Sequence, residues 1–539
     1  MNEERRKVSK SNFTRRDALK TIAVGAAGAA VLPKMLLAET TPKISFPSII
    51  SRRSGKKPNI LLILAEGTPL SALSCYGSYR MQTPNIDRLA SQGMKLENAF
   101  VTNALCTPSR ATMITGKYSN MNQMPVNAND PREGQDYFFD NSQATFPKVL
   151  KENGYNVGVV GKWDLANIPA GADYWKITYG HGGPYYDDAW YEKPEDEAEA
   201  KNNPFGVRKV HKEYVTDLTT DMAIEFMSKY KEPFCMYYST IAVHSNFEPP
   251  EKYKHIYDDV MFKEPGTFYD DYSNRSAAAR EAHMRLEDMA DSQFYDHIPE
   301  QRPKSLTDKQ RKQWNYQRFM RDFAATLHAY DDNVGRLLKY LDDSGLSENT
   351  IVIFTSDHGF FLGEHGWFDK RFMYEEAVRV PWIIRYPGEV EAGSISEAMA
   401  LNIDNAPTIL DLAGLSIPSE MQGVSLRPIF EQKVPRDWQS EMYYHYYEMA
   451  PPHWVVPHYG IRTDRYSLIN YYTINEWELF DRKYDPDEMN SLFEFGGYKL
   501  NPNYKDVVPG LVERLKQMRA KYKDTTGAPV KLWPTESYD

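Results

Sequence analysis

The chain has 539 residues, of which 41% are hydrophobic and 26% charged, and its formal net charge is -10. This length predicts two domains, or one large domain with an appendage, and the apolar content excludes wholesale disorder. The acidic balance argues against a general nucleic-acid binder, so we expect no nucleic acid among the partners. The three cysteines, Cys75, Cys106 and Cys235, are too few for a disulfide framework and show no zinc-site spacing.

Residues 1–38 have the features of an export signal. They contain the adjacent arginines of "FTRRDALK", the Ala/Gly-rich run "TIAVGAAGAAVL" and a plausible cleavage region near Ala38. We interpret them as a twin-arginine-type signal peptide, which predicts export, most simply to the periplasm; the alternative is a disordered basic tail. The apolar run is short and is broken by Pro-Lys, so we expect no membrane span. Residues 39–57 are expected to form a linker.

Short apolar runs then alternate with helical patterns. The runs are "PNILLILA", "NVGVVGKW", "PFCMYYSTIAVH", "TIVIFTSDHG" and "VPWIIRYPG", and runs of this kind are typical of strands buried on both faces. "TPNIDRLASQG" and "FAATLHAYDDNVGRLLKYLDDSG" keep helical spacing and end in Gly. The pattern predicts an α/β fold over residues 58–435, with a large mixed, mostly parallel central sheet flanked by helices.

Two stretches have little strand character and are expected to be surface loops and helices that could wall a cleft: the acidic, aromatic residues 183–213 and the charged residues 255–312. After "MQGVSLRPIFEQK" the pattern changes to the tyrosine-rich segments "EMYYHYYEM", "YSLINYY" and "EWELFD", followed by the helical "LVERLKQMRAKYK". We therefore expect a smaller C-terminal α+β domain over residues 436–539.

Polar side chains follow several of the predicted strands. They are Glu66, Lys162, His244, Asp357 and His358. Because parallel strands end at the same edge of a sheet, these residues are expected to lie close together. Two carboxylates and a histidine could bind a divalent cation, and basic groups around them could bind a tetrahedral oxyanion. A single polar residue at such a point is more often a cap or turn residue. The prediction therefore depends on all five residues following strands that end at one edge of the sheet.

The motif "CTPSR", residues 106–110, followed by "ATMITGKY", resembles the signature of type I sulfatases of the alkaline-phosphatase superfamily. Further segments match that family in order, among them "TPNIDRLASQGM", "GYNVGVVGKW", "LGEHG", "YEEAVRVPWIIRYPG", "YGIRTDRYSLI" and "EWELFDRKYDPDEMNSL". The resemblance covers roughly residues 58–495, and the closer likeness is to bacterial polysaccharide and glycosaminoglycan sulfatases. It implies an alkaline-phosphatase-like fold and an exported enzyme that hydrolyses sulfate esters of a polysaccharide or oligosaccharide.

In that family the cysteine of the signature is oxidised to formylglycine by a separate formylglycine-generating or anaerobic sulfatase-maturating enzyme. One hydroxyl of the hydrated aldehyde attacks sulfur and the other later expels sulfate, while a Ca²⁺ ion neutralises charge. The resemblance implies a Ca²⁺ site formed by Glu66, Cys106, Asp357 and His358. It implies a catalytic set of Cys106, Arg110, Lys162, His244 and Lys370. It also makes His458 and Arg462 candidate contacts to a sulfated glycan.

The sequence departs from the family pattern at two positions. Gly67 replaces the second of two adjacent aspartates, and Asp164 replaces the histidine of "GKWH". In one interpretation the site is rewired, with Asp164 paired to a lysine or acting as a base; in the other, a weakened protein only binds sulfated glycan. A phosphatase or phosphonate hydrolase on the same fold is a third possibility. The intact "CTPSR", "SDHG", Lys162, His244 and Lys370 favour an active sulfatase.

Overall fold

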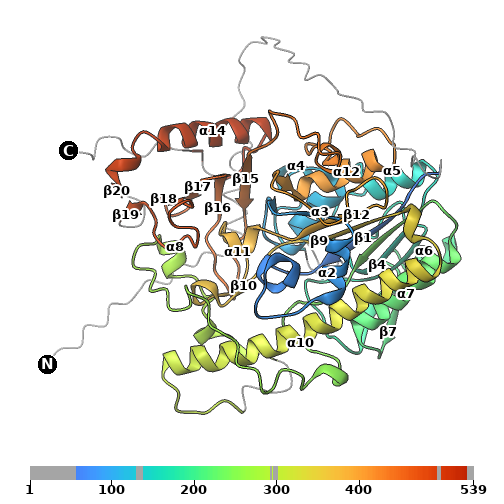
Figure 1. Ribbon diagram of the computed structural model, residues 1–539, viewed down its shortest axis with the longest axis horizontal. Coiled ribbons are helices and arrows are strands. Elements are labelled where there is room, and N and C mark those ends of the chain that lie inside the picture. The colour runs from blue at the N-terminus through green and yellow to red at the C-terminus, as the bar shows by residue number, and fades with distance from the viewer. Residues whose placement is uncertain are drawn as a thin grey trace, which may run out of the picture.

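A computed structural model describes residues 56–128, 137–291, 294, 301–494, 499–527 and 529–530. The expected signal peptide and nearly all of the expected linker lie outside these residues. A ten-stranded sheet forms the centre, in the order β13-β2-β12-β9-β1-β8-β4-β5-β6-β7 (Figure 1). Within the described ranges, no helix combines the length and apolar character needed to cross a membrane.

The central sheet is mixed, with a parallel middle. Its strands are β13 (Ser394–Ser396), β2 (Met94–Leu96), β12 (Trp382–Arg385), β9 (Thr350–Ser356), β1 (Asn59–Ala65), β8 (Phe234–Ser239), β4 (Asn156–Lys162), β5 (Tyr174–Thr178), β6 (Asp188–Glu192) and β7 (Val207–His211). The five neighbours from β9 to β5 run parallel, while β12, β6 and β7 pair antiparallel. The predicted α/β fold class is confirmed.

The burial of both faces of strand β1 explains why its sequence is apolar throughout. Its alternate side chains enter two hydrophobic cores on opposite faces of the sheet. One core takes Ile60, Leu62 and Leu64, and the other takes Leu61, Ile63 and Ala65. A strand with both faces buried cannot alternate with polar residues, so the polar Glu66 falls just beyond its end.

Helices cover both faces of the sheet (Figure 1). One face carries α2 (Pro84–Ser91), α7 (Val215–Lys229) and α10 (Asp308–Asp343); the other carries α3 (Cys106–Thr115), α5 (Phe146–Glu152) and α12 (Asn405–Leu412). Helix α10 begins earlier than the segment from which it was predicted. Thr307 caps it in a reciprocal capping box with Gln310.

The expectation for residues 183–213 was partly wrong. Besides α6 (Glu197–Asn202), this stretch forms β6 and β7, which extend the central sheet. β7 is an edge strand whose side chains are largely exposed, so its sequence "VRKVH" lacks the apolar run that marks a buried strand. Where they are described, residues 255–312 form α8 (Ala277–Arg280), a 3-10 turn (Leu286–Asp288) and the start of α10, as expected for a segment without strands.

The C-terminal part forms a four-stranded antiparallel sheet with a helix packed on it. The sheet contains β15 (Glu441–Tyr446), β16 (His458–Thr463), β17 (Tyr466–Tyr471) and β18 (Glu476–Asp481), and the helix is α14 (Val508–Lys521). These elements share one hydrophobic core with one face of the central sheet. The smaller elements are β3 (Ala99–Phe100), β14 (Ala400–Leu401), β10 (Phe361–Leu362), β11 (Phe368–Asp369), β19 (Phe493–Glu494), β20 (Lys499–Leu500), α4 (Ser119–Asn122), α11 (Glu375–Val378) and α13 (Arg427–Phe430).

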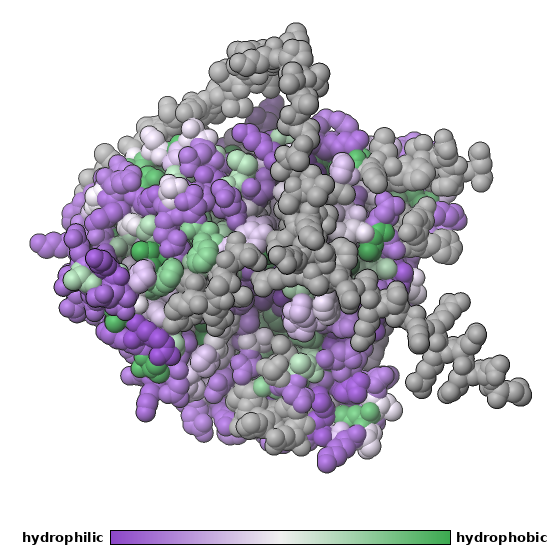
Figure 2. Space-filling model, turned by 180° about the vertical axis from the view of Figure 1, so that it is seen from behind, coloured by the Kyte–Doolittle hydropathy of each residue, from purple (hydrophilic) through white to green (hydrophobic). Residues whose placement is uncertain are grey.

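The face of the molecule in Figure 2 is mainly hydrophilic, and its hydrophobic residues are scattered in small patches. This distribution is ordinary for a folded protein surface.

Candidate active site

The predicted site residues meet where the central strands end. Glu66 follows β1, Asp357 and His358 follow β9, and Lys162 is the last residue of β4. Cys106 begins α3 beside them. Strands β9, β1 and β4 share a direction, so their carboxyl ends lie at one edge of the sheet, which is where α/β folds place ligands.

Four of these residues form a group that could hold a metal ion. One ligand atom from each of Glu66, Cys106, Asp357 and His358 lies within 4.8 Å of the others, and all four residues are buried. The Cys106 Sγ is 3.2 Å from Glu66 Oε1 and 3.3 Å from His358 Nε2. His358 Nε2 is 3.6 Å from Asp357 Oδ1. The group contains the four residues that the sequence predicted as a Ca²⁺ site.

The donor chemistry of this group fits a divalent cation. Two carboxylates supply the hard oxygen ligands that Ca²⁺ prefers. The Nδ1–H of His358 donates to the Gly359 carbonyl over 2.8 Å, so Nε2 presents its electron pair to the group. Although burial lowers it, the nearby Asp357 charge raises the pKa of His358 to about 9. A cation bound here would take the place of that proton.

Gly67 contributes its backbone to the site. Its N–H donates to Asp357 Oδ1 over 3.0 Å and holds that carboxylate in place. Its φ is +52°, in the left-handed region, and a Cβ there would lie 3.1 Å from Cε1 of His358. An aspartate at this position would therefore strain the backbone and press on a metal-site histidine. The site lacks a carboxylate at position 67, and the backbone there has a conformation that glycine adopts without strain.

Cys106 is buried at the first turn of α3, and its thiol environment is electropositive. Burial and the Glu66 charge raise the pKa of this thiol, but the positive charges of Lys162 and Lys370 outweigh them and lower it to about 6. Of the two other cysteines, Cys235 is buried on β8, where burial raises the pKa of its thiol. The site thus stabilises negative charge at position 106.

Arg110 lies one helical turn after Cys106, so both side chains leave the same face of α3. Its Nη2 donates to Glu66 Oε2 over 2.7 Å and its Nε donates to Asp357 Oδ2 over 2.9 Å. Its Nη1 donates to the Lys162 carbonyl and to Ser239 Oγ. This fully buried guanidinium joins the two carboxylates of the group and fixes their separation.

Lys162 and Lys370 add two buried positive charges. The Nζ of Lys162 is 2.8 Å from Glu66 Oε2, and the Nζ of Lys370 is 3.3 Å from Asp369 Oδ1. Burial lowers the pKa of each ammonium, yet the surrounding negative charges, with Cys106 the largest, raise both pKa values above the ordinary value. Both lysines remain charged and can attract an oxyanion.

His244 lies near these lysines, half-buried. Its Nδ1–H donates to the Ser245 carbonyl, so Nε2 is an acceptor. Burial, together with the charges of Lys370 and Lys162, holds the pKa of His244 well below its usual range. The structure therefore presents a neutral imidazole at this position.

Sequence reasoning missed two histidines in this region. His181 follows β5, and its Nδ1 is 3.0 Å from Asp164 Oδ1; Asp164 Oδ2 is also 3.8 Å from Lys162 Nζ. His453 Nε2 is 3.0 Å from Asp369 Oδ2, beside Lys370. The strand "YWKIT" before His181 mixes polar and apolar residues, so its end was not recognised as a site position. His453 comes from a loop that has no periodic pattern.

The structure buries both His458 and Arg462 in the C-terminal sheet. His458 is fully buried on β16, and its ring packs among Tyr444, Phe372 and Tyr471. Arg462 is 1% exposed and forms an ion pair with Glu375. All six residues of β16 are buried, which the alternating sequence does not reveal. Both side chains pack and pair inside the protein, and their contact with substrate stays a prediction.

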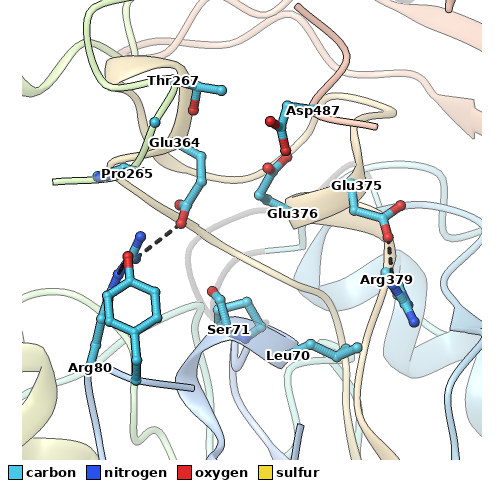
Figure 3. Close-up of a pocket in the computed structure, with 13 residues that line it drawn as sticks. Leu70, Ser71, Arg80, Pro265, Thr267, Glu364, Glu375, Glu376, Arg379 and Asp487 are labelled. Carbon is cyan, nitrogen blue, oxygen red and sulfur yellow. Dashed lines mark hydrogen bonds and ion pairs between the residues drawn. The ribbon is translucent and has the colours of Figure 1, made fainter. Parts of the chain in front are cut away.

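A separate pocket of about 310 Å³ lies near the loop that follows β1. Figure 3 shows the Glu376 and Asp487 carboxylates pointing toward one another, with a Glu364–Arg80 ion pair on one side. None of the predicted site residues is among its lining residues. The carboxylates along its wall make it unsuited to a sulfate group.

Comparison with known proteins agrees with this geometry. A family model described as Sulfatase matches residues 58–415, and one described as N-sulphoglucosamine sulphohydrolase, C-terminal, matches residues 363–521. An N-acetylglucosamine-6-O-sulfatase from Bacteroides thetaiotaomicron is 40% identical over 513 residues, which cover 87% of each chain. An ulvan-active sulfatase from Formosa agariphila is 27% identical over 503 residues, covering 89% of this chain and 86% of its own.

The fold is shared with a solved structure described as a complex with its substrate, D-glucosamine-2-N,6-O-disulfate. That structure aligns with a TM-score of 0.77 at 39% identity, covering 87% of this chain and 99% of its own. The resemblance seen in the sequence is thus confirmed by a family model that matches well over half of the chain. The chain belongs to the sulfatase family and is a sulfuric ester hydrolase.

Proposed function

We propose that this sulfatase removes the 6-O-sulfate from glucosamine units of a sulfated glycosaminoglycan. The observation that carries the proposal is the 40% identity, over 87% of both chains, to an N-acetylglucosamine-6-O-sulfatase. The structural neighbour bound to a glucosamine disulfate supports the same sugar.

The proposed nucleophile is a formylglycine made from Cys106 by a separate maturation enzyme, and the proposed cation is Ca²⁺ held by Glu66, residue 106, Asp357 and His358. When present, the hydrated formylglycine supplies the attacking oxygen and the means of sulfate release, while Ca²⁺ neutralises sulfate charge. The fit of the donor set and the electropositive surroundings of position 106 support both assignments.

The chain's own residues prepare the site for this chemistry. Arg110 keeps the two metal-site carboxylates in place through two of its nitrogen atoms, and its third nitrogen donates to the Lys162 carbonyl. The charged Lys162 and Lys370 bind oxygens of the incoming sulfate ester. His244 accepts a hydrogen bond or a proton at Nε2, since its Nδ1–H is committed to a backbone carbonyl. Together these groups orient the ester before sulfur is attacked.

The alternative of a weakened binding protein rested on Gly67 and Asp164. Each of these residues has a defined partner in the site: Gly67 holds Asp357 through its N–H, and Asp164 pairs with His181. These contacts support the rewired, active site. The twin-arginine-type segment within residues 1–38 supports export to the periplasm, where a sulfated glycan would meet the enzyme.

A panel of monosulfated sugars tests the proposal. The protein, co-expressed with a maturation enzyme and supplied with Ca²⁺, should release sulfate from N-acetylglucosamine 6-sulfate much faster than from galactosamine 4-sulfate or an aryl phosphate, as measured by ion chromatography. Preferential turnover of another sulfated position would overturn the proposed specificity. Turnover of the aryl phosphate alone would favour a phosphatase.

A further inference from the structure

Asp164 and His181 come together because two neighbouring parallel strands end side by side. β4 and β5 pair up to Lys162 and Thr178. Asp164 lies two residues beyond the first of these and His181 three beyond the second, so both leave the sheet at the edge that carries the metal group. The register thus brings the His181 imidazole beside the Asp164 carboxylate.

In the Asp164–His181 pair, Asp164 is buried and His181 is partly exposed. Asp164 has a fully buried side chain, and its Oδ1 is 3.0 Å from the buried Nδ1 of His181. The His181 side chain is 27% exposed, and since Nδ1 is buried, the exposed part is the rest of the ring. The Nζ of Lys162 also donates to the His181 carbonyl, which fixes the backbone. The imidazole therefore lies against the Asp164 carboxylate and is partly exposed.

The charges around His181 favour its protonated form. Burial lowers the pKa of His181 and the charge of Lys162 lowers it further, but the Asp164 carboxylate leaves the net pKa raised; Cys106 adds to this effect only while its side chain is an unmodified thiol. These groups face His181 from β4, from the turn after it and from α3. By contrast, the neighbouring His244 is neutral and offers an acceptor at Nε2. Of these two imidazoles, His181 is the one that carries a transferable proton.

The residue that follows His181 packs on His244. Gly182, the next residue after His181, packs so closely on His244 that a Cβ there would lie 2.5 Å from Nδ1 of that ring. Glycine at 182 lets the His181 segment close onto His244. The segment that carries His181 therefore lies against His244 and Lys162, two of the predicted site residues.

We infer that His181, positioned by Asp164, is the general acid that protonates the glycan oxygen as it leaves sulfur. The inference rests on the proposed sulfatase function and names a residue for one of its steps. As the nucleophile's oxygen bonds to sulfur, the bond from sulfur to the glycan oxygen breaks, and its electron pair stays on that oxygen. The proton on Nε2 of His181 moves to the same oxygen and gives the alcohol. The neutral His181 then regains a proton from solvent through its exposed side.

Leaving-group dependence tests this assignment. A sugar alkoxide needs a proton to leave, whereas 4-nitrophenolate does not. His181→Gln should lower kcat/KM for N-acetylglucosamine 6-sulfate by about 100-fold or more and that for 4-nitrophenyl sulfate by less than about tenfold. His211→Gln is the matched control, because His211 is a partly exposed histidine paired with Glu192 on β7, and it should change neither rate. Equal losses on both sulfates, or no loss on the sugar sulfate, would overturn the inference.

Asp164→Asn provides a second measurement. Removing the charge that raises the pKa of His181 should move the alkaline limb of the kcat/KM profile for the sugar sulfate to lower pH. NMR titration of the His181 ring in wild-type and Asp164→Asn proteins should show the same downward shift without any turnover. An unchanged His181 titration would contradict the pairing. A wild-type enzyme that is inactive on both sulfates would count against the proposed function. In that case the NMR titration would still test whether Asp164 and His181 form a pair.

Discussion

Substitutions at Gly67 distinguish two explanations for the glycine: that the site has lost a metal ligand, or that the backbone there requires glycine. Gly67→Asp restores the paired carboxylates of the family, whereas Gly67→Ala adds only a Cβ. Both variants must place a side chain at a φ of +52° with its Cβ 3.1 Å from His358. A left-handed conformation costs a non-glycine residue about 1–2 kcal/mol, which corresponds to a fall in Tm of roughly 1–3 °C for a domain of this size.

The expected result is that the two variants behave alike. Pressure on His358 should lower sulfate release at least about tenfold in both, because displaced metal-site neighbours typically cost 10–100-fold. Melting followed by circular dichroism, calorimetric Ca²⁺ titration and turnover of N-acetylglucosamine 6-sulfate measure the three effects. If Gly67→Asp instead bound Ca²⁺ more tightly and worked faster while Gly67→Ala lost activity, Gly67 would be a missing ligand and this reasoning would be refuted.

Three further predictions test other parts of the structure. Cys106→Ala should abolish turnover, whereas Cys235→Ser, which alters a buried thiol on β8, should leave turnover within about twofold; a large loss in the second would contradict the assignment of the nucleophile. Lys370→Met should raise KM and lower kcat/KM about 100-fold, as steady-state kinetics would show, because a charged sulfate contact is lost; an unchanged kcat/KM would exclude that contact. Although burial raises it, three arginines lower the pKa of Glu375 to about 2, so its ion pairs should stabilise the fold by roughly 3 kcal/mol at neutral pH. That contribution is complete above about pH 4.5 and is lost as the pH falls toward 2, so unfolding should show Glu375→Gln destabilised at pH 7 and progressively less so toward pH 2; a pH-independent difference would contradict the ion-pair explanation.

The parts of the fold that the sequence predicts are those in which burial determines residue type. Strand β1 has both faces covered, so it must be apolar throughout, and the first polar residue after it, Glu66, marks the edge that holds the site. The edge strand β7 is paired on one side and exposed, so "VRKVH" carries no such signal. Secondary-structure patterns therefore identified the centre of the sheet but missed its margin.

Burial also explains which residues of the site could be predicted from the sequence and which could not. Asp357 and Lys162 were predicted because they end buried strands, and the metal group contains the four residues expected from the motifs. His181 was missed because it follows a strand of mixed polarity, and its partnership with Asp164 depends on the register between β4 and β5. The burial of Arg462 was not predicted, because a sequence shows a charge but not the partly buried carboxylate that pairs with it.

The most direct test of the account relates modification at position 106 to sulfate release. Preparations made with graded amounts of maturation enzyme are analysed by mass spectrometry of the peptide that contains Cys106 and assayed in Ca²⁺ with N-acetylglucosamine 6-sulfate. The account predicts that the rate rises in proportion to the formylglycine fraction and extrapolates to zero in its absence. Release of the 6-sulfate by protein that carries only the unmodified thiol, or no release by fully modified protein, would contradict it.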